Sequence, residues 1–180
     1  MIVAIMALQG AFAEHQQVLQ SLGVETFLVR NLEDWSREKD ALVIPGGEST
    51  AMLKIMKDEG LFDVVKKDIG SGLPVMGTCA GLIMLDGEHL GTMNIRVRRN
   101  AYGRQLGSFV ATENVDGIGN FAMTFIRAPF IEEVGEGVEV LAKVDGRIVA
   151  ARQGKQLVTA FHPELGGDNR IHEMFLTFNS

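Results

Sequence analysis

The sequence contains a single cysteine, Cys79, among its 180 residues. One cysteine excludes an internal disulfide and any metal site built from several cysteines, and it favours a reducing, cytosolic compartment. Long apolar runs are also scarce. The longest one near the start, Ile2–Leu8, is too short to span a bilayer, and it lacks the basic n-region and cleavage site of a signal peptide. We therefore expect a cytoplasmic protein without a membrane role.

Positive charge is in short supply as well. Seventeen Lys and Arg stand against 23 Asp and Glu, which gives a formal net charge of −6, and the sequence has no long basic run. Phosphate binding needs clustered Lys and Arg, so a nucleic-acid surface is not expected. The composition, 46% hydrophobic and 22% charged, is that of an ordinary globular protein. The length and the absence of repeats and linkers predict one domain, residues 1–180.

The first half of the sequence alternates between apolar runs and segments with helical spacing. The runs are continuous, as expected for parallel strands that are covered on both faces. Phe12, His15 and Leu19 share one face of a predicted helix, and the region 49–69 predicts a second helix, broken near Gly60. The predicted strands are Ile2–Leu8, Val24–Val29, Ala41–Ile44 and Leu73–Met76.

The second half has shorter strand candidates and tight turns. Asp145-Gly146, between two of them, is a strong hairpin signal, and Ile171 to Phe178 predicts a closing amphipathic helix with Asp168 as its cap. We expect these strands to extend the sheet in antiparallel fashion or to form a small second sheet. The fold class is therefore α/β, a mixed sheet flanked by helices. The candidates are Asn94–Arg99, Ser108–Ala111, Met123–Arg127, Val138–Val144, Arg147–Arg152 and Leu157–Phe161.

The most specific motif is Gly77-Thr78-Cys79-Ala80-Gly81, directly after an apolar run. A strand that turns sharply into a helix exposes the residue at the bend, and small neighbours are needed there. This is the nucleophile-elbow pattern with Cys in place of Ser. The helix that begins at Ala80 would direct its free N–H groups at the sulfur and favour the reactive thiolate. The alternative is a buried structural cysteine in a glycine-rich turn.

A cysteine nucleophile needs a base, and the base needs an orienting group. His162 lies in Phe161-His162-Pro163-Glu164 at the end of a strand candidate. Residues i and i+2 of an extended stretch share a face, so Glu164 could hold the His162 ring. The alternative is a strand-end histidine satisfied by solvent. Among the other histidines, His15 is expected to pack on a helix face, and His89 and His172 to be ordinary surface residues.

A third motif, Pro45-Gly46-Gly47-Glu48-Ser49-Thr50, follows a predicted strand. Paired glycines allow backbone N–H donors to approach an anionic tetrahedral intermediate closely. The donors of this oxyanion hole would be the N–H groups of Gly47 and Ala80. A simple strand-to-helix turn capped by Ser49 or Thr50 is the alternative, and it is compatible with the first interpretation. The lysine of a Walker sequence is absent, which disfavours a phosphate loop.

Six segments, taken together and in order, resemble the glutaminase subunit of pyridoxal 5′-phosphate synthase, a class I glutamine amidotransferase family. The Gly-x-Cys-x-Gly and His-Pro-Glu segments are shared by all class I amidotransferases. The segments that narrow the resemblance to the vitamin B6 branch are Gly-Gly-Glu-Ser-Thr, Arg-Asn-x-x-Gly-Arg-Gln and Phe-Ile-Arg-Ala-Pro. The segments are Ala7-Leu8-Gln9-Gly10, Pro45-Gly46-Gly47-Glu48-Ser49-Thr50, Gly77-Thr78-Cys79-Ala80-Gly81, Arg99-Asn100-Ala101-Tyr102-Gly103-Arg104-Gln105, Phe125-Ile126-Arg127-Ala128-Pro129 and Phe161-His162-Pro163-Glu164.

The resemblance implies a three-layer, flavodoxin-like fold and a triad in which Cys79 attacks glutamine, His162 moves protons and Glu164 orients His162. It also implies that L-glutamine is bound by a further set of residues and that the reaction needs no metal and no cofactor. Ammonia would pass to a separate synthase subunit in a hetero-oligomeric complex. The implied glutamine-binding residues are Gly46, Gly47, Glu48, Arg99, Ile126 and Arg127.

Two departures and two rival functions accompany the resemblance. The segment 85–91 is shorter than the family pattern predicts, and the sequence given ends early, at Ser180, which could alter docking to the partner. One rival is another enzyme on the same scaffold, such as the amidotransferase subunit of histidine biosynthesis or a γ-glutamyl hydrolase. The other is a non-catalytic binding module, whose usual mark is a missing triad residue. We expect weak activity until the partner organises the loop at Gly46-Gly47.

Overall fold

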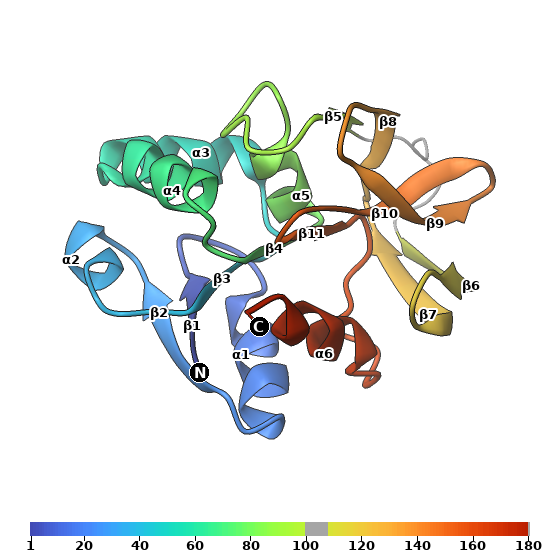
Figure 1. Cartoon of the computed structure of the whole chain (residues 1–180), viewed down its shortest axis with the longest axis horizontal. Coiled ribbons are helices and arrows are strands. Elements are labelled where there is room, and N and C mark those ends of the chain that lie inside the picture. The colour runs from blue at the N-terminus through green and yellow to red at the C-terminus, as the bar shows by residue number, and fades with distance from the viewer. Residues whose placement is uncertain (100–107, 180) are drawn as a thin grey trace.

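The computed structural model describes residues 1–99 and 108–179 (Figure 1). Within them, nine strands form one mixed sheet in the order β2-β1-β3-β4-β11-β10-β8-β5, with β9 paired to β10, and β6 and β7 form a second, two-stranded sheet. The expected α/β class is confirmed. Both alternatives for the later strands hold at once, because some extend the large sheet in antiparallel fashion and two form a small one. The candidate Leu157–Phe161 is an exception, since its strand joins the large sheet parallel to the strand at Val75–Thr78.

The first part of the large sheet is parallel. It contains β2 (Glu25–Val29), β1 (Ile2–Met6), β3 (Ala41–Ile44), β4 (Val75–Thr78) and β11 (Gln156–Thr159). In register, Gly77 pairs with Ile44 of β3 and Thr78 pairs with Thr159 of β11. The carboxyl ends of these three strands therefore meet at one edge, where ligands lie in open α/β sheets.

The remaining strands are antiparallel. They are β10 (Arg147–Gln153), β9 (Glu139–Val144), β8 (Phe130–Val134), β5 (Ile95–Arg98), β6 (Ser108–Val115) and β7 (Gly119–Ile126). The Asp145-Gly146 hairpin joins β9 to β10, and both residues have positive φ, 51° and 78°, as this turn requires. The sequence did not predict β8, and it predicted β6 and β7 too short, because their exposed, alternating residues carry little apolar signal.

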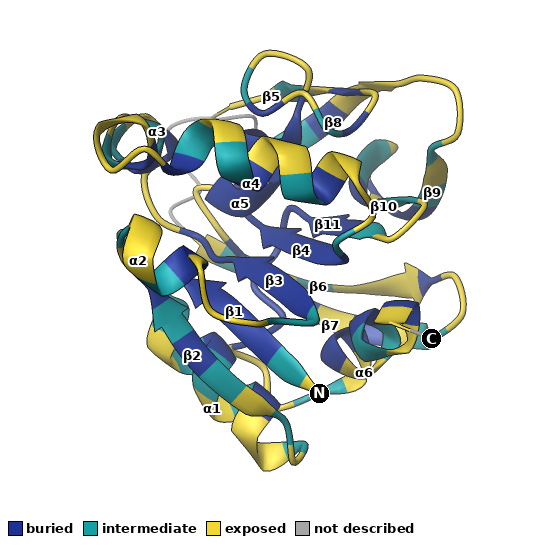
Figure 2. Cartoon of the chain, turned by 60° about the vertical axis from the view of Figure 1, so that its left-hand side comes forward, coloured by how far each residue is buried: buried dark blue, intermediate teal, exposed yellow. Residues whose placement is uncertain are grey.

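Helices cover both faces of the sheet and give three layers (Figures 1 and 2). On one face lie α1 (Phe12–Ser21) and α6 (Arg170–Leu176), the latter followed by a 3-10 turn, Thr177–Asn179. On the other lie α3 (Ser49–Asp58), α4 (Leu61–Gly70) and α5 (Ala80–Leu85), while the short α2 (Leu32–Trp35) packs beside β2. Within the described ranges, no helix is both long and apolar enough to cross a membrane.

The helix boundaries follow local chemistry. Gly60 adopts φ 72° between α3 and α4, so the predicted break is confirmed. The cap of α3 is Glu48 rather than Ser49 or Thr50, since its carboxylate accepts the N–H groups of Thr50 and Ala51 at 3.1 and 2.8 Å. Asp168 was the predicted cap of α6. Its carboxylate accepts the N–H of Arg170, the first residue of the helix, but the N-cap itself is Asn169, one residue later.

The glycines of the bend allow α5 to pack tightly on the sheet. A Cβ built on Gly81 would lie 1.9 Å from the carbonyl oxygen of Ile44 in β3. Close packing of this kind cannot relax without moving backbone, because the contact is with a main-chain atom of a fully buried strand. The α5 helix is therefore fixed against β3, and with it the start of the helix behind Cys79.

Gly81→Ala is expected to lower the free energy of unfolding by about 3 kcal/mol, because overpacking here must displace α5 or β3. Gly70→Ala is the matched control. Gly70 ends α4, has open space around its Cα and should gain up to about 1 kcal/mol. Urea denaturation of both variants measures the difference. Equal stability of the two variants would contradict the close packing of α5 on β3.

Candidate active site

Cys79 occupies the sharp bend between β4 and α5. Its backbone has φ 53° and ψ −106°, a region that residues other than glycine rarely adopt, and its N–H donates to Thr159 O at 2.8 Å. A Cβ built on Gly77 would lie 2.5 Å from Gly81 O, so both flanking glycines are required sterically. The strained bend that the Gly-x-Cys-x-Gly spacing predicts is present, with the side chain 7% exposed.

His162 and Glu164 follow β11 and form a short hydrogen bond. The Nδ1–H of His162 donates to Glu164 Oε1 at 2.6 Å, and both residues are buried. Burial alone would lower the pKa of His162, but its hydrogen bonds with Cys79 and Glu164 and their negative charges raise that pKa to about 10. At neutral pH His162 is therefore an imidazolium, which is suited to pair with a thiolate on Cys79.

The loop Gly46-Gly47 lies against Cys79 and His162. A Cβ on Gly46 would lie 2.6 Å from His162 Cε1 and 3.3 Å from Cys79 Cβ, so any larger residue would displace the imidazole ring. Gly46 thus permits the approach of Cys79 and His162. Gly47 and Ala80, the two predicted oxyanion donors, both line the same pocket.

A support for this loop comes from the segment after β1. Gln9 Oε1 accepts the N–H of Glu48 at 2.6 Å, and Gly46 O accepts the N–H of Ala11 at 3.1 Å. Gly10 has φ 90°, and a Cβ there would lie only 1.7 Å from Gly46 O. In the sequence, Gln9 and Gly10 belong to one of the motifs that carry the family resemblance, which assigns neither of them a role. A glycine between a predicted strand and a predicted helix was the available signal for their supporting role.

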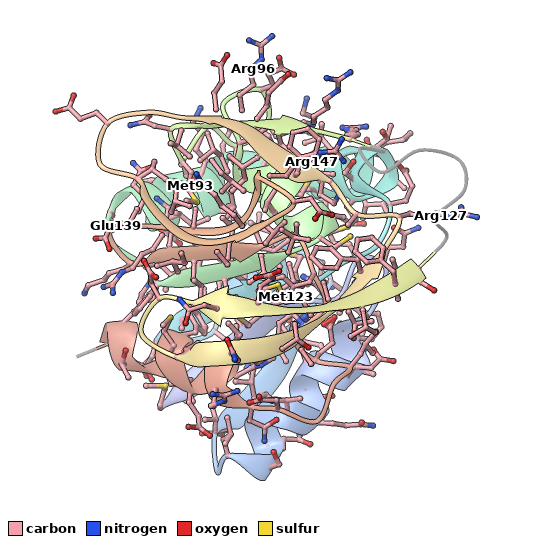
Figure 3. The ribbon with its side chains drawn as sticks, turned by 90° about the vertical axis from the view of Figure 1, so that its right-hand side faces the viewer. Met93, Arg96, Met123, Arg127, Glu139 and Arg147 are labelled. Carbon is pink, nitrogen blue, oxygen red and sulfur yellow. The ribbon has the colours of Figure 1, made fainter. Side chains whose placement is uncertain are left out.

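A pocket of about 430 Å³ opens over Cys79. That volume is in the range of small-molecule sites. Ile126 lies outside this set of lining residues, but its carbonyl oxygen is 3.9 Å from Cys79 Sγ. Arg127 has φ 45° and lies at the end of β7, at the edge of the molecule in Figure 3. The lining residues are Gly47, Glu48, Ser49, Cys79, Ala80, Ile83, Arg99, Arg127 and Pro129.

Arg99 is held in this pocket by two hydrogen bonds. It donates to Thr50 Oγ1 at 3.2 Å and to His89 Nε2 at 3.0 Å, while the other ring nitrogen of His89 lies 2.6 Å from Asp86 Oδ1. The expectation of an ordinary surface residue at His89 is wrong, since its side chain is 10% exposed and bonded on both sides. The rest of the predicted motif, 100–105, lies outside the described residues.

His172 was also expected at the surface, and that expectation is wrong too. His172 on α6 is fully buried, as is His15 on α1, and the two rings are joined by a hydrogen bond of 2.9 Å between His15 Nδ1 and His172 Nε2. Burial lowers the pKa of His172 to about 4 and that of His15 well below its usual value. The amphipathic spacing of the closing helix placed Ile171 and Phe175 in the core but gave no signal for His172.

Acid should weaken the fold through His172. Unfolded histidine takes up a proton near pH 6.5, whereas folded His172 remains neutral down to about pH 4, so its contribution is present above pH 6.5 and lost as the pH falls toward 4. Between pH 7 and 4.5 we expect a loss of about 2 kcal/mol from this residue. Urea denaturation of wild type and His172→Gln at both pH values should show a smaller loss in the variant. Equal losses would contradict the assignment.

The comparisons with known proteins agree with this geometry. Residues 5–179 match the sequence model of the SNO glutamine amidotransferase family. The pyridoxal 5′-phosphate synthase subunit PdxT of Methanocorpusculum labreanum is 56% identical, with 97% of this chain and 95% of that protein covered. The PdxT of Desulfitobacterium hafniense is 51% identical, with 97% and 91% covered.

A crystal structure of a glutamine amidotransferase superimposes with a TM-score of 0.92 at 44% identity and covers 98% of both chains. Sequence and structure therefore agree over nearly the whole chain, and the expected three-layer amidotransferase fold is confirmed. An enzyme of this class fits a strained cysteine beside a buried histidine–glutamate pair. The protein belongs to the SNO glutamine amidotransferase family.

Proposed function

We propose that this chain is the glutaminase subunit of a pyridoxal 5′-phosphate synthase, and that Cys79, His162 and Glu164 are its catalytic triad. The observation that carries the proposal is the bend at Cys79, next to a buried His162 whose Nδ1 lies 2.6 Å from Glu164 Oε1. The names of the PdxT relatives support the choice of synthase. A non-catalytic module is disfavoured because all three triad residues are present.

Hydrolysis of L-glutamine in this site takes two steps. The Cys79 thiolate adds to the side-chain amide carbon, and the N–H groups of Gly47 and Ala80 stabilise the resulting oxyanion. His162 protonates the departing nitrogen, the C–N bond breaks, and ammonia leaves a thioester behind. Water, deprotonated by neutral His162, then attacks the thioester, the C–S bond breaks, and glutamate is released with the thiolate restored.

The polar groups around the pocket supply the glutamine site. Arg99 and Arg127 line it with positive charge that complements the α-carboxylate of glutamine, and the carbonyl of Ile126 is beside the sulfur. Gly46, Gly47 and Glu48 contribute through the backbone, because the Glu48 carboxylate is engaged in capping α3. No metal and no cofactor is needed for this chemistry, since the nucleophile, the base and the oxyanion donors all belong to the chain.

The ammonia is passed to a separate synthase subunit in a hetero-oligomeric complex. Activity is weak until that subunit docks and organises the Gly46-Gly47 loop. We further propose that residues 1–180 form a single glutaminase domain acting in the cytoplasm, because β10 and β11 join the two halves of the chain in one sheet.

Ammonia release from glutamine tests the function directly. With the cognate synthase subunit added, wild type should release ammonia at least tenfold faster than alone, and Cys79→Ala should release none, because no thioester can form. Gly70→Ala, which does not line the pocket, is the control that should match wild type. The readout is coupled detection of ammonia and glutamate.

Each alternative outcome has its own meaning. Release that depends on Cys79 but ignores the synthase subunit would keep the glutaminase and overturn the proposed synthase. Cleavage of γ-glutamyl peptides in preference to glutamine would favour the hydrolase rival. Absence of Cys79-dependent release in both conditions would favour the binding module.

Arg99→Lys tests the glutamine site. The planar guanidinium bonds Thr50 and His89 at once, which a lysine ammonium cannot reproduce in the same geometry. We expect KM for glutamine to rise about tenfold with kcat little changed, equivalent to about 1.4 kcal/mol of lost binding. Arg98→Lys, an exposed neighbour 3.8 Å from Glu132, is the control and should leave KM unchanged. A fall in kcat alone would contradict a binding role.

A further inference from the structure

Only one of the two carboxylate oxygens of Glu164, Oε1, is bonded within the proposed triad. Glu164 Oε1 accepts from His162, whereas Oε2 faces His15 Nε2 at 3.2 Å, and the side chains of His15 and Glu164 are both fully buried. No described residue makes a hydrogen bond of acceptable geometry to Oε2, so the 3.2 Å contact with His15 Nε2 is a polar contact without hydrogen-bond alignment. A buried carboxylate oxygen is costly without a donor, so the contact with His15 matters for where Glu164 lies and how it is held.

His15 reaches this position because α1 and α6 lie side by side under the carboxyl ends of β4 and β11 (Figure 1). Its Nε2 is 2.9 Å from Thr78 Oγ1 at the end of β4, and its Nδ1 is 2.9 Å from His172 Nε2. The titratable groups that face His15 are therefore His172 from α6 and the pair His162 and Glu164 after β11.

The contacts determine which ring nitrogens carry protons. A lone pair on His15 Nε2 would face the Glu164 carboxylate and repel it, so Nε2 carries the hydrogen, which it donates to Thr78 Oγ1, and Nδ1 accepts. His172 must then donate from its Nε2, which leaves its Nδ1 as a bare acceptor, the buried atom that has no partner among the described residues. The carboxylate therefore selects one arrangement of neutral rings, and His172 completes it.

We propose that His15, bonded to Thr78 and His172, is a positioning residue whose Nε2–H lies beside Glu164 Oε2 and so holds the carboxylate in line with His162. The inference rests on the proposed triad. His15 touches neither glutamine nor the sulfur, and it acts through Glu164. A neutral donor suits this place, because a second cation beside Glu164 would compete with the His162 imidazolium for the same negative charge.

Two polar, non-titrating variants separate this role from simple packing. An Asn side chain ends where Nδ1 of His15 lies, so His15→Asn keeps an atom for His172 and loses the N–H beside Glu164 Oε2. A Gln side chain extends to the position of Nε2, so His15→Gln restores an N–H there. Leu19→Ala is the control for lost stability, because Leu19 is one turn further along α1, fully buried and apolar.

The first readout is the pH titration of the His162 imidazole, followed by NMR on the isolated full chain, which requires no glutamine. We expect His15→Asn to lower the midpoint of this titration by about one pH unit, because a poorly held Glu164 stabilises the His162 imidazolium less. His15→Gln and Leu19→Ala should stay within about 0.2 units of wild type on the same reasoning. A midpoint that moves equally in His15→Asn and Leu19→Ala would overturn the proposal.

The second readout is steady-state hydrolysis of glutamine with the synthase subunit present. His15→Asn should lower kcat about tenfold or more with KM within about twofold, and His15→Gln should recover most of kcat, as expected when an outer partner of a catalytic group is lost and restored. Unchanged kcat in His15→Asn would overturn the inference while leaving the triad intact. Full activity in Glu164→Gln and Cys79→Ala would instead overturn the proposed function, so the two failures are distinguishable.

Discussion

Parallel pairing of β4 with β3 on one side and β11 on the other is the constraint on which the site depends. Ile44 pairs with Gly77, and Thr159 pairs with Thr78, so the residues that leave each strand are brought to one edge within a few ångströms. Cys79 then donates its N–H back to Thr159, which ties the bend to the strand that carries the histidine. The geometry of the proposed catalytic site is therefore determined first by backbone register and then by side-chain contacts.

Much of this was accessible from the sequence. Continuous apolar runs identified the parallel strands, the glycines around Cys79 predicted the bend, and the His162-Pro163-Glu164 spacing predicted the buried pair, because each is a short-range pattern with one steric or chemical meaning. What the sequence could not show was the partner of each polar side chain. His15 and His172 meet across 157 residues of chain, and no local pattern encodes such a contact. The same holds for Arg99 and Thr50, which are 49 residues apart in the sequence.

The buried polar groups on the two sides of the sheet edge differ in charge at neutral pH. On the pocket side, the charges of His162 and Glu164 compensate one another, and the pKa of His162 rises to about 10. On the α1–α6 side, His15 and His172 are kept neutral by burial, with lowered pKa values. The ionised pair His162 and Glu164 is therefore packed against two neutral histidines, so the core holds no uncompensated charge from these groups at neutral pH.

The late position of β11 in the sequence affects the order in which the sheet folds during synthesis. Val75 of β4 pairs with Gln156, so this contact closes a long loop and forms late compared with the β1–β2 and β1–β3 pairs. During synthesis the ribosome releases the cysteine-bearing bend well before the strand that brings His162 and Glu164. A nascent or truncated chain therefore carries its proposed nucleophile without its proposed base, and both are present only once the last strand of the sheet has been made.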